Sequence, residues 1–241
     1  MGRTVRGTVL AQLALLAGVL TGCAESAEPG DGKPSASAGG PAEERSGPGS
    51  SKGTVRSGGS VGAAGSACAL PVTFETAEKW RPEAVETGAP ADGSGSEEDA
   101  LAAELAEGLL HQGPFTAACE IDAKPAGNIG FLRVWTGEAD ATGGDAKGRD
   151  AKALLKKFVA AEGNTSVAEY RAFRSDSGVP GAEVEYLYTS EALGETKKER
   201  AFLTITPQGA AVVVHLGGLD TEEHEEMLPA YELARRTLST V

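Results

Sequence analysis

The chain has 241 residues, of which 33 are Gly and only 5% are aromatic, and its formal net charge is −13. This acidity argues against a nucleic-acid-binding protein, because phosphate contacts require clustered Lys and Arg side chains. No stretch reaches about 18 consecutive apolar residues, so we expect no conventional membrane-spanning helix.

Residues 1–22 have the pattern of a secretory signal peptide. Arg3 and Arg6 precede an apolar segment, residues 8–20, that is too short to span a bilayer permanently. Leu20-Thr21-Gly22-Cys23 then resembles the bacterial lipobox. The resemblance implies cleavage before Cys23, a diacylglycerol on its sulfur, and anchoring by acyl chains at the outer face of the cytoplasmic membrane. The alternative is an ordinary signal peptide in which the cysteine is incidental.

Residues 23–67 have the composition of a flexible tether. After Cys23 this segment contains 11 Gly, 9 Ser, 8 Ala and 4 Pro in 44 residues. Such a chain buries too little apolar surface to offset the entropy lost on ordering, so we predict a disordered, lipid-anchored linker. The acidity then belongs to residues 68–241, which hold 30 acidic and 16 basic residues.

Residues 68–241 are enough for a single globular domain with one core. Periodicity predicts strands at 71–75 and 80–85, a helix at 97–111, and a hairpin of strands at 115–121 and 129–136. A helix capped by Asp150 follows, then a meander of strands at 167–173, 182–189, 201–206 and 210–216. The last helix starts near Asp220 and is expected to kink or restart at Pro229. The predicted fold class is α+β, a mostly antiparallel sheet (hairpin plus meander) packed with about three helices.

Cys68 and Cys119 are the two cysteines left for the folded domain. An extracytoplasmic location favours a disulfide between them, which would fasten the start of the domain to its sheet. Two buried free thiols remain the alternative, because pairing geometry cannot be derived from sequence.

These features together resemble a family. The lipobox, the Gly/Ser-rich tether, and the segments Ala67–Phe74, Cys119–Ile121 and Trp135–Gly137 are similar to actinobacterial secreted lipoproteins of unknown function. The order of elements resembles the PsbP/LpqN-like α/β/α sandwich. The resemblance implies accessory and binding roles more than catalysis, and it supplies no active-site residues.

The three histidines do not form a recognisable metal or catalytic motif. We expect His111 to close a helix, His215 to lie in the core or at an edge of the sheet, and His224, within Glu222–Glu226, to lie on a solvated helix N-terminus. No zinc-ligand spacing occurs, so we predict no metal site and no cofactor beyond the acyl anchor. Weak Ca²⁺ binding by the acidic Glu222–Glu226 segment is the alternative.

The sequence contains no Ser-x-x-Lys and no phosphate-binding loop, so we predict no catalytic residues. The expected function is that of a non-catalytic lipoprotein of the cell envelope, a binding or accessory module. Its partners would be the membrane, through the lipid, and an envelope protein, a lipid or a small apolar ligand. A transporter's solute-binding lipoprotein is one alternative, although 174 residues are few for a two-lobed hinge. An envelope hydrolase is the other, and it would require a perturbed carboxylate or His in a pocket.

Overall fold

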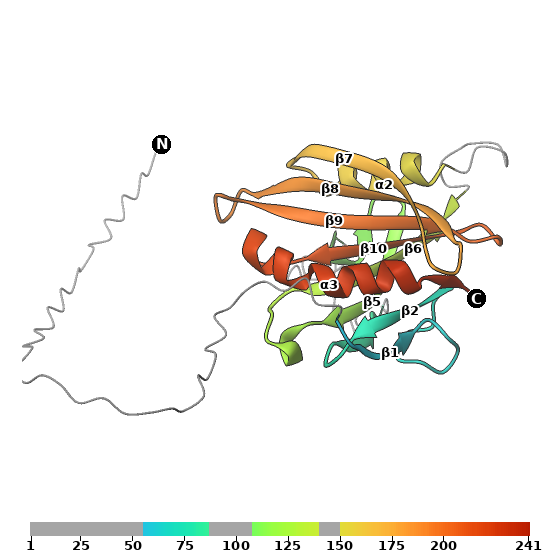
Figure 1. Ribbon diagram of the computed structural model, residues 1–241. Coiled ribbons are helices and arrows are strands. Elements are labelled where there is room, and N and C mark those ends of the chain that lie inside the picture. Colours follow the sequence, from blue (N-terminus) through green and yellow to red (C-terminus); the bar gives the residue numbers. More distant parts are fainter. Residues whose placement is uncertain (1–54, 87–107, 140–149) are drawn as a thin grey trace, which may run out of the picture. The chain divides into compact units, whose positions relative to one another are not determined.

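The computed structural model in Figure 1 describes residues 55–86, 108–139 and 150–241. Its large sheet is formed by β3 (Arg81–Ala84), β4 (His111–Gln112), β5 (Phe115–Asp122), β6 (Phe131–Glu138), β7 (Thr165–Arg174), β8 (Pro180–Ser190), β9 (Glu195–Ile205) and β10 (Ala210–Gly217). The strand order is β3-β5-β6-β10-β9-β8-β7, with β4 paired to β5. A smaller sheet has the order β1-β2-β11, with β1 at Ser57–Val61, β2 at Val72–Ala77 and β11 at Ser239–Thr240.

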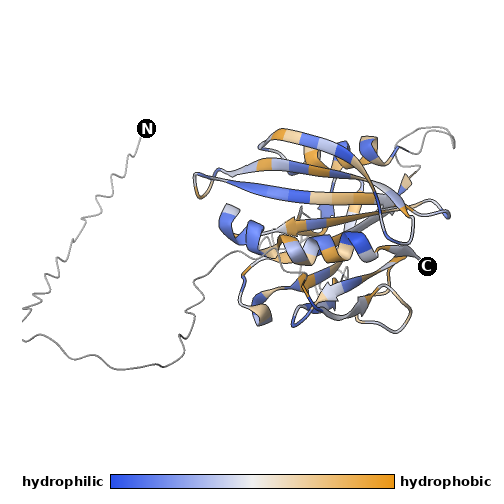
Figure 2. Ribbon diagram, in the orientation of Figure 1, coloured by the Kyte–Doolittle hydropathy of each residue, from blue (hydrophilic) through white to orange (hydrophobic). Residues whose placement is uncertain are grey.

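Two helices cover opposite faces of the large sheet. Alternate residues of β10 show the division: Val212 and Val214 belong to the core under α3 (Thr221–Thr237), and Val213 belongs to the core under α2 (Ala151–Glu162). This alternation follows from the two-residue period of a strand. Figure 2 shows that α3 carries both hydrophobic and hydrophilic residues, as expected for a helix that packs on one side only.

The predicted fold class, α+β with a mostly antiparallel sheet, is confirmed. The hairpin is β5–β6, the meander is β7–β8–β9–β10, and β10 joins the two by pairing with β6. Asp150 caps α2 by accepting a hydrogen bond from the Lys152 amide, at 2.9 Å. A short 3₁₀ helix, η1 (Lys124–Ala126), lies in the hairpin turn.

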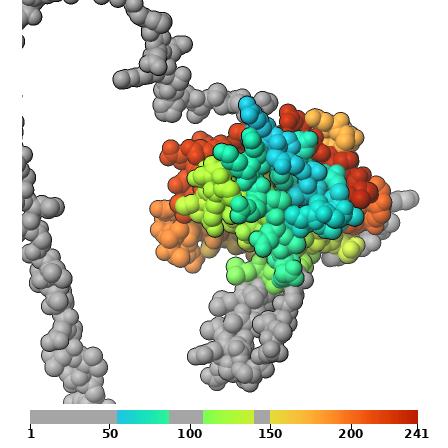
Figure 3. All heavy atoms as spheres, turned by 90° about the horizontal axis from the view of Figure 1, so that it is seen from below, coloured from blue at the N-terminus to red at the C-terminus, as the bar shows by residue number. Residues whose placement is uncertain are grey.

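The boundary placed at residue 68 is wrong, because the domain already includes β1. Val61 is buried, and β1 pairs along its length with β2, so residues 57–67 belong to the fold rather than to a tether. Figure 3 shows the segment from residue 55 onward packed into the surface of the domain. The Gly-rich composition has a structural cause here: Gly62 has φ +103°, and a Cβ on it would lie 1.8 Å from the Val72 carbonyl oxygen. The earlier part of the predicted tether lies outside the described residues.

Two helix predictions need correction. Most of the predicted helix at 97–111 lies outside the described residues; Gly108–Leu110 is helical, but His111 belongs to β4 and Leu109 is exposed. The last helix does not restart at Pro229, since α3 runs without a break from Thr221 to Thr237; the other expectation, a kink at Pro229, stays a prediction. The short strands β1, β4 and β11 have no signal in the hydrophobic pattern.

The structure contains a disulfide between Cys68 and Cys119, whose Cα atoms are 5.9 Å apart. Cys119 lies on β5, and Cys68 lies in the connection between β1 and β2. The bond therefore links the β1–β2 connection to the large sheet. Cys23, the predicted lipidation site, lies outside the described residues. Among the residues described, no helix is long and apolar enough to cross a membrane.

Candidate functional site

A pocket of about 470 Å³ lies beside the C-terminal end of α2, on the α2 face of the large sheet. Its floor comes from strands β6, β8, β9 and β10, and one wall comes from the last residues of α2 and the segment 108–112. The lining residues that carry charge, can carry charge or are aromatic are His111, Phe131, Arg133, Trp135, Glu162, Tyr188, Lys197, Glu199 and His215. A pocket with this many ionisable groups suits a polar ligand better than an apolar one.

Strand register brings the polar groups of the pocket together. His215 on β10 pairs with Arg133 on β6, and Glu199 on β9 pairs with Tyr186 on β8. Side chains on one face of a sheet recur every second residue, so these strand positions all point to the α2 face. Glu162 is the last residue of α2 and completes the group from above the sheet.

Glu162, Tyr186 and His215 form a connected chain of polar contacts. The Tyr186 hydroxyl donates to Glu162 Oε2 at 2.5 Å and lies 3.1 Å from His215 Nε2. The imidazole is held between two rings: Tyr186 stacks on it, and Phe158 approaches it edge-on at a centroid distance of 5.8 Å. The position of the His215 ring is therefore fixed by packing as well as by polar contacts.

Glu199 lies at the bottom of the pocket, and its side chain is only 2% exposed. Its Oε1 is 2.8 Å from Lys197 Nζ, and its Oε2 is 2.5 Å from His215 Nε2. One carboxylate oxygen is thus held by a lysine, and the other faces the imidazole.

The pKa shifts favour the charged forms of Glu199 and His215 and the protonated form of Glu162 beside them. Burial raises the pKa of Glu162, and the neighbouring Glu199 charge adds to this, against the influence of His215. Burial also acts to raise the pKa of Glu199, but His215 and Lys197 outweigh it and the pKa lies below the ordinary value. Burial acts to lower the pKa of His215, and Glu199 outweighs it, so that the pKa is raised. Both of these shifts favour the charged forms, so the geometry favours an imidazolium paired with the Glu199 carboxylate.

Arg133 forms the cationic part of the wall on β6. Its guanidinium lies 4.6 Å from the centre of the Phe131 ring and 5.7 Å from that of Trp135, and it pairs with Glu120 on β5. Arg133 is one-quarter exposed, so its free edge can meet a ligand.

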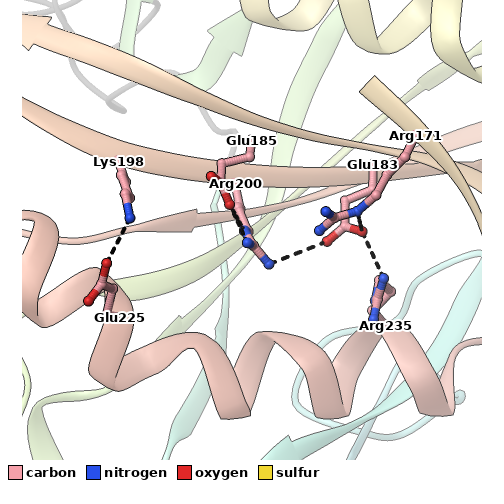
Figure 4. Close-up of polar contacts among 7 residues, drawn as sticks. All are labelled: Arg171, Glu183, Glu185, Lys198, Arg200, Glu225 and Arg235. Atoms are coloured by element: carbon pink, nitrogen blue, oxygen red, sulfur yellow. Dashed lines mark hydrogen bonds and ion pairs between the residues drawn. The ribbon is translucent and has the colours of Figure 1, made fainter. Parts of the chain in front are cut away.

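A second ionic cluster lies on the opposite face, between the sheet and α3 (Figure 4). Glu183 is fully buried and contacts three arginines: Arg171 at 2.8 Å, Arg235 at 2.7 Å and Arg200 at 4.0 Å. Burial acts to raise the pKa of Glu183, but the arginines outweigh it and the pKa is lowered. Each partner comes from a different element, β7, α3 and β9, so we assign this cluster to fastening α3 to the sheet rather than to a ligand.

The prediction that His224 lies on a solvated helix N-terminus is wrong, because the residue is buried. It is 1% exposed, and neither ring nitrogen has a hydrogen-bond partner among the described residues. The helical period explains the difference, because His224 shares a face of α3 with Met227 and Tyr231, which are both buried. Burial lowers the pKa of His224 to about 4.

The structure groups three residues that sequence analysis did not connect. Ligand atoms of Glu162, Glu199 and His215 lie within 4.8 Å of one another, whereas we expected no metal-binding group. His215 was expected in the core or at an edge, and it is in the core. The available signal was the presence of polar residues at inward-facing strand positions, Lys197, Glu199 and His215, where an apolar residue would ordinarily stand.

A family profile described as "uncharacterised lipoprotein" (Lipoprotein_23) matches residues 38–238. The chain belongs to this family. The predicted resemblance to secreted lipoproteins of unknown function is confirmed, and the match also includes β1, which the sequence analysis left in the tether. A search of curated proteins gives no match for this lipoprotein.

Among solved structures, the lipoprotein is similar to the solution structure of cyanobacterial PsbP (CyanoP) from Synechocystis sp. PCC 6803. The identity is 12%, the TM-score is 0.44, and the alignment covers 71% of this chain and 87% of the other. At this level the similarity says nothing about ligand or function.

Proposed function

We propose that this lipoprotein is a non-catalytic binding or accessory module of the cell envelope, which takes a small polar ligand in the pocket at Glu162, Glu199 and His215. The lipid on Cys23 would hold it at the outer face of the cytoplasmic membrane. The observation that carries the proposal is the pocket itself. Burying charged groups costs a fold free energy even when they are paired, and here several of them are gathered beside an open volume of about 470 Å³.

The pocket can be blocked without disturbing the core. Ala161 is exposed and lines the pocket, while the neighbouring Ala160 is exposed and does not line it. Ala161→Trp should fill the entrance, and Ala160→Trp is the matched control. The protein would be purified from membranes in mild detergent and examined by native mass spectrometry. We expect a non-covalent mass on the wild type and on Ala160→Trp that is lost from Ala161→Trp; equal spectra for all three would contradict the proposal.

The anchor is tested separately. Cells expressing the wild type or Cys23→Ala would be labelled with a radioactive fatty acid. We expect label on the wild type only, because the lipobox resemblance assigns the acyl groups to Cys23. Labelling of Cys23→Ala, or its retention in the membrane fraction, would refute the assignment.

A second candidate function, an envelope hydrolase, is favoured by one observation. The raised pKa of Glu162 and the ionised state of Glu199 resemble an acid and base pair in a pocket. Against it, Glu199 is held by Lys197 and His215, and no described residue lining the pocket is a Ser, Thr or Cys. Release of nitrophenol from nitrophenyl glycosides or esters, abolished in Glu162→Gln, would favour the hydrolase over the binding module.

A further inference from the structure

We infer that Glu162, Glu199 and His215 form a binding site for one divalent transition-metal ion. This inference rests on the proposed binding role of the pocket and names the class of ligand. One imidazole nitrogen with two carboxylate oxygens is a donor set that suits Zn²⁺ and its neighbours in the first transition row.

The spacing of the three donors is close to what such an ion requires. Bonds of about 2.0–2.1 Å in a tetrahedral site place ligand atoms roughly 3.3 Å apart. The three groups lie between 2.5 Å, from His215 Nε2 to Glu199 Oε2, and at most 4.8 Å. An ion entering between them would therefore open the His215–Glu199 contact by about 1 Å and draw Glu162 inward, which side-chain rotation alone can supply.

Each carboxylate already has a polar neighbour that holds one of its two oxygens. Lys197 holds Glu199 Oε1 and leaves Oε2 for an ion, and the Tyr186 hydroxyl holds Glu162 Oε2 and leaves Oε1. Outer contacts of this kind orient ligand groups in metal sites. Lys197 also donates to the Gly218 carbonyl, which fixes the ammonium beside the first oxygen of Glu199.

Glu199 supplies a buried oxygen to this group. Its Oε2 faces the imidazole and lies 2.5 Å from His215 Nε2. An ion would take the place of the proton between these two atoms, and that proton would be released to solvent. The pocket leaves the remaining coordination positions accessible to water or to a small ligand.

The test is titration of the full chain, purified in detergent and treated with chelator, with ZnCl₂ in a calorimeter. The variants are Glu162→Gln, which keeps an acceptor for Tyr186, and His215→Gln; the matched control is the exposed Glu195→Gln on β9. We expect one Zn²⁺ per chain, affinity reduced at least about tenfold in both pocket variants, and no change in Glu195→Gln. Near-ultraviolet circular dichroism would confirm that each variant is folded.

The visible spectrum of bound Co²⁺ reports on the metal ligands directly, so it would not appear if the three residues had only a structural role. Co²⁺ at the site should produce visible ligand-field absorption in the wild type, which Zn²⁺ abolishes by displacement. Absence of Zn²⁺ binding, binding that survives both pocket substitutions, or equal binding of Mg²⁺ would overturn the inference. With any of these three results, a co-purifying mass that is present on the wild type and absent from Ala161→Trp would still support the binding role. Only the metal would then be excluded.

Discussion

Replacement of His224 should remove a loss of folding stability that occurs as the pH falls. Burial among the residues under α3 lowers the pKa of His224 to about 4, against 6.5 for the ordinary side chain. Between these values the unfolded chain binds a proton that the folded chain does not, so stability falls as the pH falls. Well above pH 6.5 His224 is neutral in both states, and it contributes no pH dependence there.

The size of the effect follows from the two pKa values. Linkage gives a loss of about 2 kcal/mol at pH 5 and about 3 kcal/mol at pH 4 relative to pH 7.5. His224→Leu keeps an apolar side chain of similar size and has no proton to bind. The difference in unfolding free energy between variant and wild type should therefore move in favour of the variant by these amounts as the pH falls.

The assay is urea unfolding of both proteins at half-unit steps from pH 7.5 to 4. Met227→Leu, a buried substitution on the same face of α3 with no titratable group, is the control for packing and should differ from wild type by a constant amount. A constant difference between His224→Leu and wild type across this range would refute the reasoning, because it would mean that His224 titrates alike in both states.

Three further predictions concern stability, each measured by urea unfolding at pH 7.5. Replacing both Cys68 and Cys119 by Ala should cost about 4 kcal/mol, because the bond closes a loop with a sequence separation of 51; a loss below 1 kcal/mol would contradict this. Gly62→Ala should cost about 2 kcal/mol or more, since its φ is +103° and the new Cβ meets a carbonyl. An unchanged urea midpoint would indicate that residues 57–67 belong to the tether and not to the domain. Glu183→Gln should cost about 2 kcal/mol, because Arg171 and Arg235 each lose a charged hydrogen-bond partner, while Glu225→Gln at the exposed pair should change nothing measurable; equal effects would refute the fastening role.

The fold was predictable where periodicity is strong and unpredictable where pairing depends on distant strands. The β5–β6 hairpin and the meander follow from alternation and turn residues such as Thr206 and Gly209. The strand β1 is different: four of its five residues are exposed, and its Gly and Ser content matches that of a linker. It is a strand because it pairs with β2, and the composition of the segment carries no information about that pairing.

The candidate site shows the same limit. His215 could be assigned to the core from Val213 and its strand, but Glu162 and Glu199 lie on a helix end and on another strand, 37 residues apart in sequence. Their approach depends on how α2 crosses the sheet, which no local pattern specifies. His224 was misassigned because its acidic neighbours dominate the segment, although its spacing to Met227 already placed it on the buried face.

The most direct test of the central claim is a crystal structure of the protein equilibrated with Zn²⁺, with data collected on both sides of the zinc absorption edge. The account predicts one anomalous peak in the pocket, about 2.0–2.2 Å from His215 Nε2 and from one oxygen each of Glu162 and Glu199. A pocket without a peak, with His215 still in direct contact with Glu199, would contradict it.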